Sequence, residues 1–240
     1  MRATVVSLFD SSGIVLKPWA LQGADCYCFD IKNETKFEDG IQYVKADLNP
    51  GSLGWIDVER VLQSSMGIRI GFSFPPCNDL ASSGSRHFAK KRKKDPLFQR
   101  TAVSRAVISQ KRFSKNGFAF CIENPVGMLS SLWMPPMLYW HPYEFGGYLP
   151  DDDVHPLYPE YIPPRDAYTK KTGAWFGGGF VFPEKRAVDP EVLQRTTKNG
   201  RLIRGSRQFM LLGGSSDRTK TIRSLTPRGI SEAFYQANRG

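Results

Sequence analysis

Short hydrophobic runs recur along the first half of the chain and are separated by polar segments. Their length and their β-branched and aromatic content predict strands at residues 3–9, 25–31, 41–48, 68–74 and 118–122. Apolar positions at helical spacing predict helices at residues 14–22, 56–65 and 97–114, although Pro18 disturbs the first of them. Strands that alternate with helices favour an α/β fold, in which a mostly parallel sheet is flanked by helices.

The pattern changes after about residue 131. Residues 132–165 are rich in Pro, Tyr and Trp, and residues 172–182 predict short strands. Residues 184–218 are basic and polar with few periodic signals, which indicates a small loop-rich lobe. Thr226-Pro227 is typical of the start of a helix. We therefore expect a main domain at 1–183, a basic insertion at 184–218, and a C-terminal segment at 219–240 that returns to the main domain.

Composition and charge narrow the choice of partner. The chain has 240 residues, of which 40% are hydrophobic, so a real core is feasible. A net charge of +10 favours an anionic partner, nucleic acid first, although a merely basic enzyme is the alternative. We see no membrane span and no signal peptide, and the four cysteines lack disulfide-framework spacing, which favours the cytoplasm. Cys26 and Cys28 are more typical of a buried strand than of a metal site, and the three histidines are scattered.

The first predicted strand leads into a turn, Asp10-Ser11-Ser12-Gly13, and then into a helix. Asp30 ends the second strand, where a carboxylate can bind a ribose hydroxyl. This order is typical of a nucleotide pocket, but the turn has one glycine and no G-x-G-x-x-G pattern, which counts against a pyrophosphate ligand. S-adenosylmethionine carries no phosphate and fits better. An ordinary turn between a strand and a helix remains the alternative.

Cys77 follows two prolines at the carboxyl end of an apolar strand, in Phe74-Pro75-Pro76-Cys77-Asn78. This edge of an α/β sheet is where ligands bind, and the prolines restrict the backbone there. A thiol must be partly ionised to attack, and positive neighbours help it to ionise. The position indicates a nucleophile, with a buried structural cysteine as the alternative.

Glu123-Asn124-Pro125 ends the next apolar strand, so we expect the Glu123 carboxyl group on the same edge as Cys77. A thiol and a carboxyl group suit one reaction well. A thiolate that adds to carbon 6 of cytosine breaks the aromaticity of the ring, and an acid at N3 stabilises the charge, so that carbon 5 can attack a sulfonium methyl group. A helix cap or an ion-pair partner is the alternative for Glu123.

Phe74-Pro75-Pro76-Cys77 with Glu123-Asn124-Pro125 resembles the two signature motifs of the DNA cytosine-5 methyltransferases, in the same order and at the same strand ends. The strings PPCNDLASSG, ENPVGMLSS, HPYEFGGYLP and YTKKTGAWFG are similar to a compact subfamily common in bacteriophages and prophages. The resemblance covers most of the chain. It implies a Rossmann-like S-adenosylmethionine-dependent methyltransferase fold.

The resemblance also implies roles for individual residues. Cys77 would be the covalent nucleophile and Glu123 the acid at N3. The cofactor S-adenosylmethionine would be bound by Phe9, Asp10, Gly13, Asp30, Asp47, Pro75 and Asn78. The substrate would be contacted by Asn124, Pro125, Arg86, Lys90, Lys91, Lys170 and Lys171. Of these, Lys170 and Lys171 stand in for the family's arginine motif, and Arg86, Lys90 and Lys91 lie where the family has a mobile loop that closes over the flipped base. A solvated charge run is the alternative for that loop.

Five features depart from the family pattern. The turn at residues 10–13 has one glycine where the family usually has several, and the arginine motif has no clean match. Asn78 stands where the family has Gln, and Gln236-Ala237-Asn238 is only an echo of the final motif that returns to the cofactor. The large target-recognition region is reduced to about residues 184–218, which implies relaxed or very short target sites.

The sequence thus predicts a DNA (cytosine-5-)-methyltransferase that acts on a flipped cytosine in a duplex or on a single strand, as a monomer, in the cytoplasm of a bacterial host and encoded by a phage or prophage. RNA or a free nucleotide as substrate, a DNA-binding relative that has lost turnover, and transfer of a group larger than methyl remain alternatives.

Overall fold

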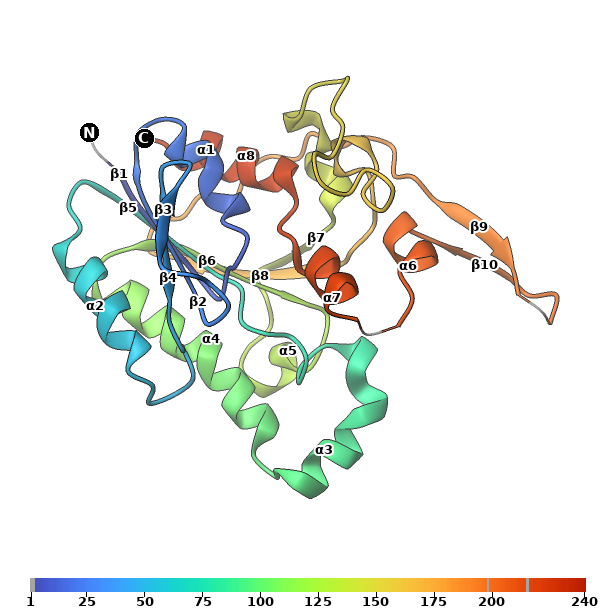
Figure 1. Ribbon diagram of the computed structural model, residues 1–240, viewed down its shortest axis with the longest axis horizontal. Coiled ribbons are helices and arrows are strands. Elements are labelled where there is room, and N and C mark those ends of the chain that lie inside the picture. Colours follow the sequence, from blue (N-terminus) through green and yellow to red (C-terminus); the bar gives the residue numbers. More distant parts are fainter. Residues whose placement is uncertain (1–2, 198, 215) are drawn as a thin grey trace.

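The computed structural model describes residues 3–197, 199–214 and 216–240 (Figure 1). Its centre is an eight-stranded sheet in the order β3-β4-β2-β1-β5-β6-β8-β7. The strands are β1 (Ala3–Leu8), β2 (Asp25–Asp30), β3 (Lys36–Glu38), β4 (Ile41–Lys45), β5 (Ile68–Ser73), β6 (Ala119–Pro125), β7 (Leu138–Trp140) and β8 (Thr172–Gly177).

Five neighbouring strands, β4-β2-β1-β5-β6, run parallel, and the antiparallel pairings lie toward the two ends of the sheet. The predicted α/β class, with a mostly parallel sheet flanked by helices, is confirmed. The five strands predicted from the first half of the chain are all present. Because parallel strands end on the same side, the segments after β1, β2, β4, β5 and β6 meet at one edge, which we call the carboxyl edge.

Helices cover both faces of the sheet and bury its alternating side chains. On one face, α2 (Gly54–Ser64) and α4 (Phe98–Lys115) pack against residues such as Val6 and Phe120. On the other face, α1 (Lys17–Ala20) and α8 (Arg228–Asn238) pack against residues such as Val5 and Phe72. Val5 and Val6 point to opposite faces because successive strand residues alternate.

The chain begins α1 with a 3-10 turn, η1 (Ile14–Leu16), and the predicted helix at 14–22 ends early at Ala20. The predicted strand at 172–182 ends at Gly177, because Gly178 and Gly179 take positive φ values of 66° and 86°. The sequence did not predict β3, β7 or α3 (Phe88–Lys94).

The remaining elements are short. They are the 3-10 turns η2 (Ser82–His87), η3 (Pro142–Tyr148) and η4 (Pro164–Asp166), the helices α5 (Leu129–Leu132), α6 (Arg207–Leu211) and α7 (Asp217–Ser224), and the strands β9 (Leu193–Thr196) and β10 (Leu202–Gly205). β9 and β10 form a separate antiparallel hairpin. This hairpin and α3 both project from the body of the molecule (Figure 1).

Ion pairs and a backbone hydrogen bond hold α8 against Asp153 and against the end of η4. The Arg228 guanidinium donates to both carboxylate oxygens of Asp153 at 2.7 Å. Asp166, which is buried, accepts a 3.0 Å hydrogen bond from the backbone N–H of Gly229. One buried acid, Asp166, and one partly buried acid, Asp153, thus anchor the first turn of α8, and the C-terminal segment returns to the sheet.

Candidate active site at the carboxyl edge

Cys77 lies four residues beyond the end of β5, on a rigid turn. The backbone N–H of Phe74 donates to Leu8 O at 3.0 Å, which continues the pairing with β1. Two prolines follow, and the carbonyl of Cys77 then accepts hydrogen bonds from Leu80 N at 2.9 Å and Ala81 N at 2.8 Å. The thiol is therefore held from both sides, and it is partly buried.

The segment after β6 holds the Cys77 turn in place. The buried Asn124 amide donates to Pro75 O at 2.7 Å. Ala81 and Gly127 form an isolated β-bridge, and a Cβ on Gly127 would come within 2.1 Å of Leu80 O, so only glycine fits there. Asn124 was predicted to contact substrate, but its amide nitrogen is bonded to the turn that presents Cys77. The atom left over is Asn124 Oδ1, which is buried without a partner among the described residues.

Glu123 lies near the end of β6, paired with Ala174 of β8. Burial raises the pKa of its carboxyl group, and the Lys170 ammonium and the Thr172 hydroxyl oppose that shift. Burial also raises the pKa of the Cys77 thiol, the negative charge of Glu123 raises it further, and Lys170 lowers it. The Cys77 thiol therefore lies close enough to Glu123 to sense its charge.

Lys170 is the cation that this pair shares. Its side chain is half-buried, and its ammonium donates to Arg223 O in α7 at 3.2 Å. Because Lys170 lowers the pKa of both Cys77 and Glu123, it stabilises one negative charge on the pair wherever that charge sits. We call Cys77, Glu123 and Lys170 the thiol–carboxyl cluster.

A cavity of about 20 Å³ opens beside this cluster. Its walls include Glu123, Lys170 and Cys121, and α8 closes it with Ile230 and Phe234. Such a volume holds about one water molecule. The sequence did not indicate that α8 and the segment before it would cover the site, since this depends on contacts between residues far apart in the chain.

The turn after β1 is built around the Asp10 carboxylate, which is buried. It accepts hydrogen bonds from Ser7 Oγ, from the backbone N–H and hydroxyl of Ser12, and from the backbone N–H of Gly13, at 2.8 to 3.0 Å. Gly13 has a φ of 64°, and a Cβ there would come within 2.4 Å of the Tyr43 hydroxyl. Asp10 thus shapes the turn, and its two oxygens are already satisfied. The preceding residue, Phe9, takes a left-handed φ of 56° and packs edge-on against Trp55.

The other two acids proposed for the cofactor differ in how their oxygens are used. Asp47 accepts from Asn49 N at 2.9 Å and from Ser52 Oγ at 3.0 Å, which shapes the turn before α2. Asp30 accepts from Lys32 N at 2.8 Å through Oδ1, and among the described residues its Oδ2 accepts no hydrogen bond. Burial raises the pKa of Asp30. Of the two, Asp30 has the oxygen free for a ligand.

Asn33 is a positioning residue that the sequence reasoning missed. Its buried amide donates to Cys28 O at 2.9 Å and, at 3.4 Å, to Asp10 O and Val44 O. One side chain therefore ties together the ends of β1, β2 and β4. Nothing in the local pattern around Asn33 could have shown this, because its partners lie in β2, in β4 and in the turn after β1.

The basic residues proposed to contact substrate fall into two groups. Arg86 and Lys90 are exposed, and the Arg86 guanidinium donates to His87 Nε2 at 3.0 Å. Lys91 instead donates to Asn78 O at 2.9 Å and to Asp79 Oδ1 at 2.6 Å, so it braces the segment after Cys77. Lys171 points to another neighbour than Lys170 does, since its ammonium lies 4.7 Å from the centre of the Tyr139 ring.

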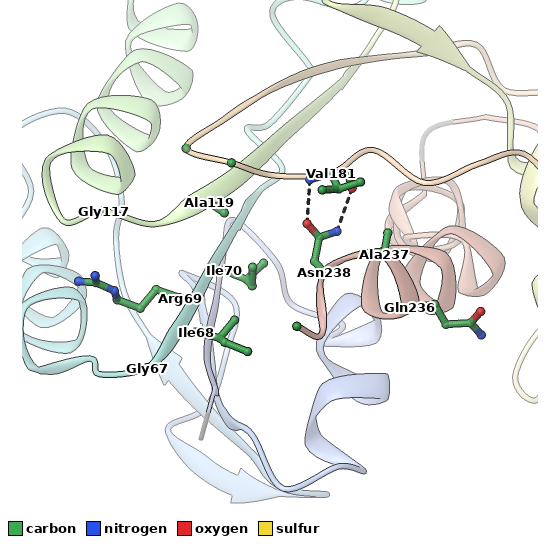
Figure 2. A pocket seen from close by; sticks show the side chains of 13 residues that line it. Gly67, Ile68, Arg69, Ile70, Gly117, Ala119, Val181, Gln236, Ala237 and Asn238 are labelled. Atoms are coloured by element: carbon green, nitrogen blue, oxygen red, sulfur yellow. Dashed lines mark hydrogen bonds between the residues drawn. The ribbon is translucent and has the colours of Figure 1, made fainter. Parts of the chain in front are cut away.

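A larger hollow, of about 390 Å³, lies at the opposite edge of the sheet, where β5 and β6 begin. Figure 2 shows Asn238 in this hollow, and its side chain exchanges two hydrogen bonds with the backbone of Val181, at 2.8 and 2.9 Å. The residues that echo the family's final motif, Gln236-Ala237-Asn238, therefore lie at this opposite edge and not at the carboxyl edge. α8 runs away from the carboxyl edge, so it is the start of this helix that reaches the candidate site.

Metal-binding clusters and membrane-spanning helices are both absent from the described residues. No group of three or more candidate side chains could hold a metal ion. None of the helices in this part of the chain combines the length and the apolar character that crossing a bilayer requires.

Comparison with known proteins gives weak similarities. No family profile matches the chain, and no curated protein matches it. One solved structure that is similar is that of a protein named as a candidate DNA modification methyltransferase, encoded within a prophage of Escherichia coli. The match has a TM-score of 0.40 and 12% identity, and it covers 73% of this chain and 46% of that one, so this chain spans about half the length of that protein. A similarity this low assigns no functional residue.

Proposed function

We propose that this protein transfers a methyl group from S-adenosylmethionine to carbon 5 of cytosine in DNA, through a covalent bond between Cys77 and carbon 6. The observation that supports this most directly is the thiol–carboxyl cluster, in which Cys77, Glu123 and Lys170 share one small region of the carboxyl edge. A nucleophile and an acid beside each other suit attack on carbon 6 of cytosine, because protonation at N3 makes that carbon more electrophilic.

The charges in the cluster are coupled. A protonated Glu123 can hold its proton at cytosine N3, and it no longer repels a thiolate on Cys77. The raised pKa of Glu123 favours this protonated state, and Lys170 is placed to stabilise the thiolate that accompanies it. Lys170 lowers the pKa of both groups, so it stabilises the negative charge that a Cys77 thiolate carries, and addition of that thiolate to carbon 6 requires the proton to be on Glu123. Elimination of the thiol after loss of the carbon 5 proton restores the aromatic ring.

The residues around the turn after β1 fit the proposed cofactor. Asp30 Oδ2 is free to accept from a ribose hydroxyl, and the exposed Asn78 and half-buried Phe9 border the same edge. The 20 Å³ cavity holds only about one water, so the cofactor would lie above Phe9 and Asp30 at the surface. When bound, S-adenosylmethionine supplies an electrophilic methyl group. Asp10 and Gly13 would act by keeping the turn open, and Pro75 by fixing the segment before Cys77.

DNA is the substrate that the charge favours. The net charge is +10, and α3 carries four exposed basic side chains, Lys90, Arg92, Lys93 and Lys94. Cytosine in a duplex cannot present carbon 6 to a thiol, so the base must be flipped out or single-stranded. We propose that the exposed residues of α3 contact phosphates near the flipped base, in a bacterial cell that carries phage or prophage DNA.

The test is a covalent trap. DNA that contains 5-fluorocytosine, incubated with protein and S-adenosylmethionine, should give an adduct that survives denaturing electrophoresis, because the fluorine blocks elimination of the thiol. Cys77→Ala should give no adduct. Cys121→Ala is the matched control, because Cys121 also lines the cavity yet is buried within β6. An adduct that survives Cys77→Ala, or its loss in Cys121→Ala alone, would refute the assignment.

The substrate is tested separately with labelled cofactor. Duplex DNA, single-stranded DNA, RNA and deoxycytidine monophosphate should be compared side by side, with mass spectrometry of the product nucleosides. If the label appears as 5-methylcytidine in RNA and not in DNA, the proposed chemistry would stand and the substrate would be RNA. A protein that binds DNA and releases no heat with S-adenosylmethionine would be a relative without turnover.

A further inference from the structure

The β9–β10 hairpin has no evident role inside the fold. Its strands, Leu193–Thr196 and Leu202–Gly205, pair only with each other and project from the body (Figure 1). Beyond the paired strands, two hydrogen bonds join Thr197 and Arg201. Thr197 N donates to Arg201 O at 2.8 Å, and Arg201 N donates to Thr197 Oγ1 at 3.1 Å. An isolated two-stranded ribbon is marginally stable by itself, so a binding partner is the best explanation for a hairpin that projects into solvent.

The register of the strands separates two faces. Leu202 is opposite Thr196, and Arg204 is opposite Gln194, so these four side chains share one face. All four are exposed. The other face carries Leu193, Arg195, Ile203 and Gly205, and Phe209 of α6 covers its base, since a Cβ on Gly205 would come within 2.4 Å of that ring. We call the first set the open face.

The base of the hairpin is fixed firmly. Arg207 forms a two-pronged ion pair with Glu191 and donates to Pro159 O at 2.7 Å. Glu191 N in turn donates to Ala167 O at 2.7 Å. A guanidinium–carboxylate fork sets direction as well as distance, so the hairpin is presented at a defined angle.

The hairpin emerges close to the thiol–carboxyl cluster. Gln208, three residues after β10, is buried and lowers the pKa of the Tyr168 phenol, which burial and the charge of Glu123 raise. Tyr168 lies two residues before Lys170. A ligand gripped by the hairpin would therefore lie next to the candidate active site.

The charge of this region selects an anionic partner. Residues 192–216 carry five basic side chains and no acidic one. The open face adds side chains that recognise base edges, because Arg forms paired hydrogen bonds with guanine, Gln does so with adenine, and apolar or methyl groups contact the thymine methyl.

We propose that the β9–β10 hairpin enters the major groove of duplex DNA and that Gln194 and Arg204 read base pairs beside the target cytosine. This inference rests on the proposed function for the identity of the target base. The dimensions agree, since a strand of four residues spans about 13 Å and the groove is about 12 Å wide and 8.5 Å deep and admits a two-stranded ribbon. The major groove of an RNA duplex is too narrow for such a ribbon.

The experiment is a binding selection that does not depend on turnover. Full-length protein with Cys77→Ala selects from random DNA duplexes that contain one central cytosine, with S-adenosylmethionine present, and the bound pool is sequenced. Three proteins are compared: this parent, the parent with Arg204→Ala, and the parent with Arg195→Ala. Arg195 is the matched control, since it is a neighbouring exposed arginine on the other face.

The parent should enrich a short consensus that includes a guanine near the cytosine. Arg204→Ala should lose the preference at that one position, with a roughly tenfold drop in affinity for the consensus, while the other positions stay. Arg195→Ala should weaken all sequences alike, with the salt dependence of log K reduced by about one and the consensus unchanged. Gln194→Ala should relax a different single position.

An unchanged consensus in both Arg204→Ala and Gln194→Ala would overturn the inference, as would a parent that enriches no consensus or that binds an RNA duplex equally well. Circular dichroism of each variant shows that the fold is intact, and exposed hairpin positions should not alter it. A consensus found together with no covalent adduct in the 5-fluorocytosine assay would separate the two proposals, because the reading surface would then be right and the chemistry wrong.

Discussion

Asp10 and Glu123 both lie at the carboxyl edge of the sheet, and their surroundings differ. Asp10 is buried and accepts four hydrogen bonds from the turn around it. Glu123 is also at a strand end, but only the Thr172 hydroxyl and the Lys170 ammonium oppose the effect of its burial, and its pKa is raised. A carboxylate with all its donors in place maintains structure. One that is short of donors can exchange a proton with a ligand.

The largest effect should come from removing the satisfied carboxylate. Asp10→Ala leaves the N–H groups of Ser12 and Gly13 without an acceptor, so the free energy of unfolding should fall by about 3 kcal/mol. Urea denaturation followed by circular dichroism measures this. Glu123→Gln is the comparison, and it should not destabilise the protein at pH 8. If both variants lost the same stability, the distinction between the two carboxylates would be void.

Lys170→Met should have the next largest effect, on activity. Without the ammonium the pKa of both Cys77 and Glu123 rises, so less thiolate forms, and methyl transfer at pH 7 should drop about tenfold and partly recover at higher pH. The pH profile of kcat/KM shows this as an alkaline shift of its acid limb. Lys171→Met is the control, because Lys171 faces Tyr139, and it should leave the position of that limb unchanged.

The pH dependence of stability tests Glu123 itself. Its folded pKa lies above the unfolded value, so protonation favours the folded state: this stabilisation is complete below the unfolded pKa and is lost as pH rises through the folded pKa. The free energy of unfolding of the native chain should therefore fall relative to Glu123→Gln as pH rises from about 4 upward. Parallel curves over that range would contradict a raised pKa.

The smallest effect concerns Lys91. Its partner Asp79 is a half-buried carboxylate, with fewer donors than Asp10 and more exposure to water than Glu123. Lys91→Met breaks an ion pair of 2.6 Å with partly exposed groups, and should cost less than about 1 kcal/mol of unfolding free energy. Lys90→Met, at an exposed neighbour, should leave stability unchanged and weaken DNA binding in a salt-dependent manner. Thermal denaturation and fluorescence titration with duplex DNA distinguish the two variants.

The sequence predicted the parallel part of the sheet because each of its strands is a compact apolar run between turn residues, as in Ile68–Ser73. It also placed Cys77 and Glu123 on one edge, because consecutive parallel strands end on the same side. The exposed three-residue strand Lys36–Glu38 has no such run, and antiparallel pairing with β4 alone creates it. The roles of the candidate residues as ligands of substrate and cofactor remain predictions.

What the sequence could not give are the contacts that span the chain. Lys170 and Lys171 are adjacent and identical in type, yet only Lys170 reaches the cluster, because α7 accepts its ammonium at Arg223 O. The hairpin was predicted as loop, since its strands, Leu193–Thr196 and Leu202–Gly205, lack an apolar face and are held by their register and by the Arg207–Glu191 pair. Hydrophobic periodicity predicts which residues are buried. It could not predict the Lys170–Arg223 contact or the hairpin, because neither is part of the buried core.

The direction of β8 has a consequence for how this architecture can vary. Because β8 runs antiparallel to β6, the segment that precedes β8 arrives at the same edge that β6 leaves. The segment between residues 126 and 169 therefore leaves the sheet and returns to it at the same carboxyl edge, so its two ends lie close together. Chain length could be added to or removed from its exposed tip, around Leu157, without shifting Glu123 relative to Lys170, which makes this segment a natural point for grafting a foreign recognition module.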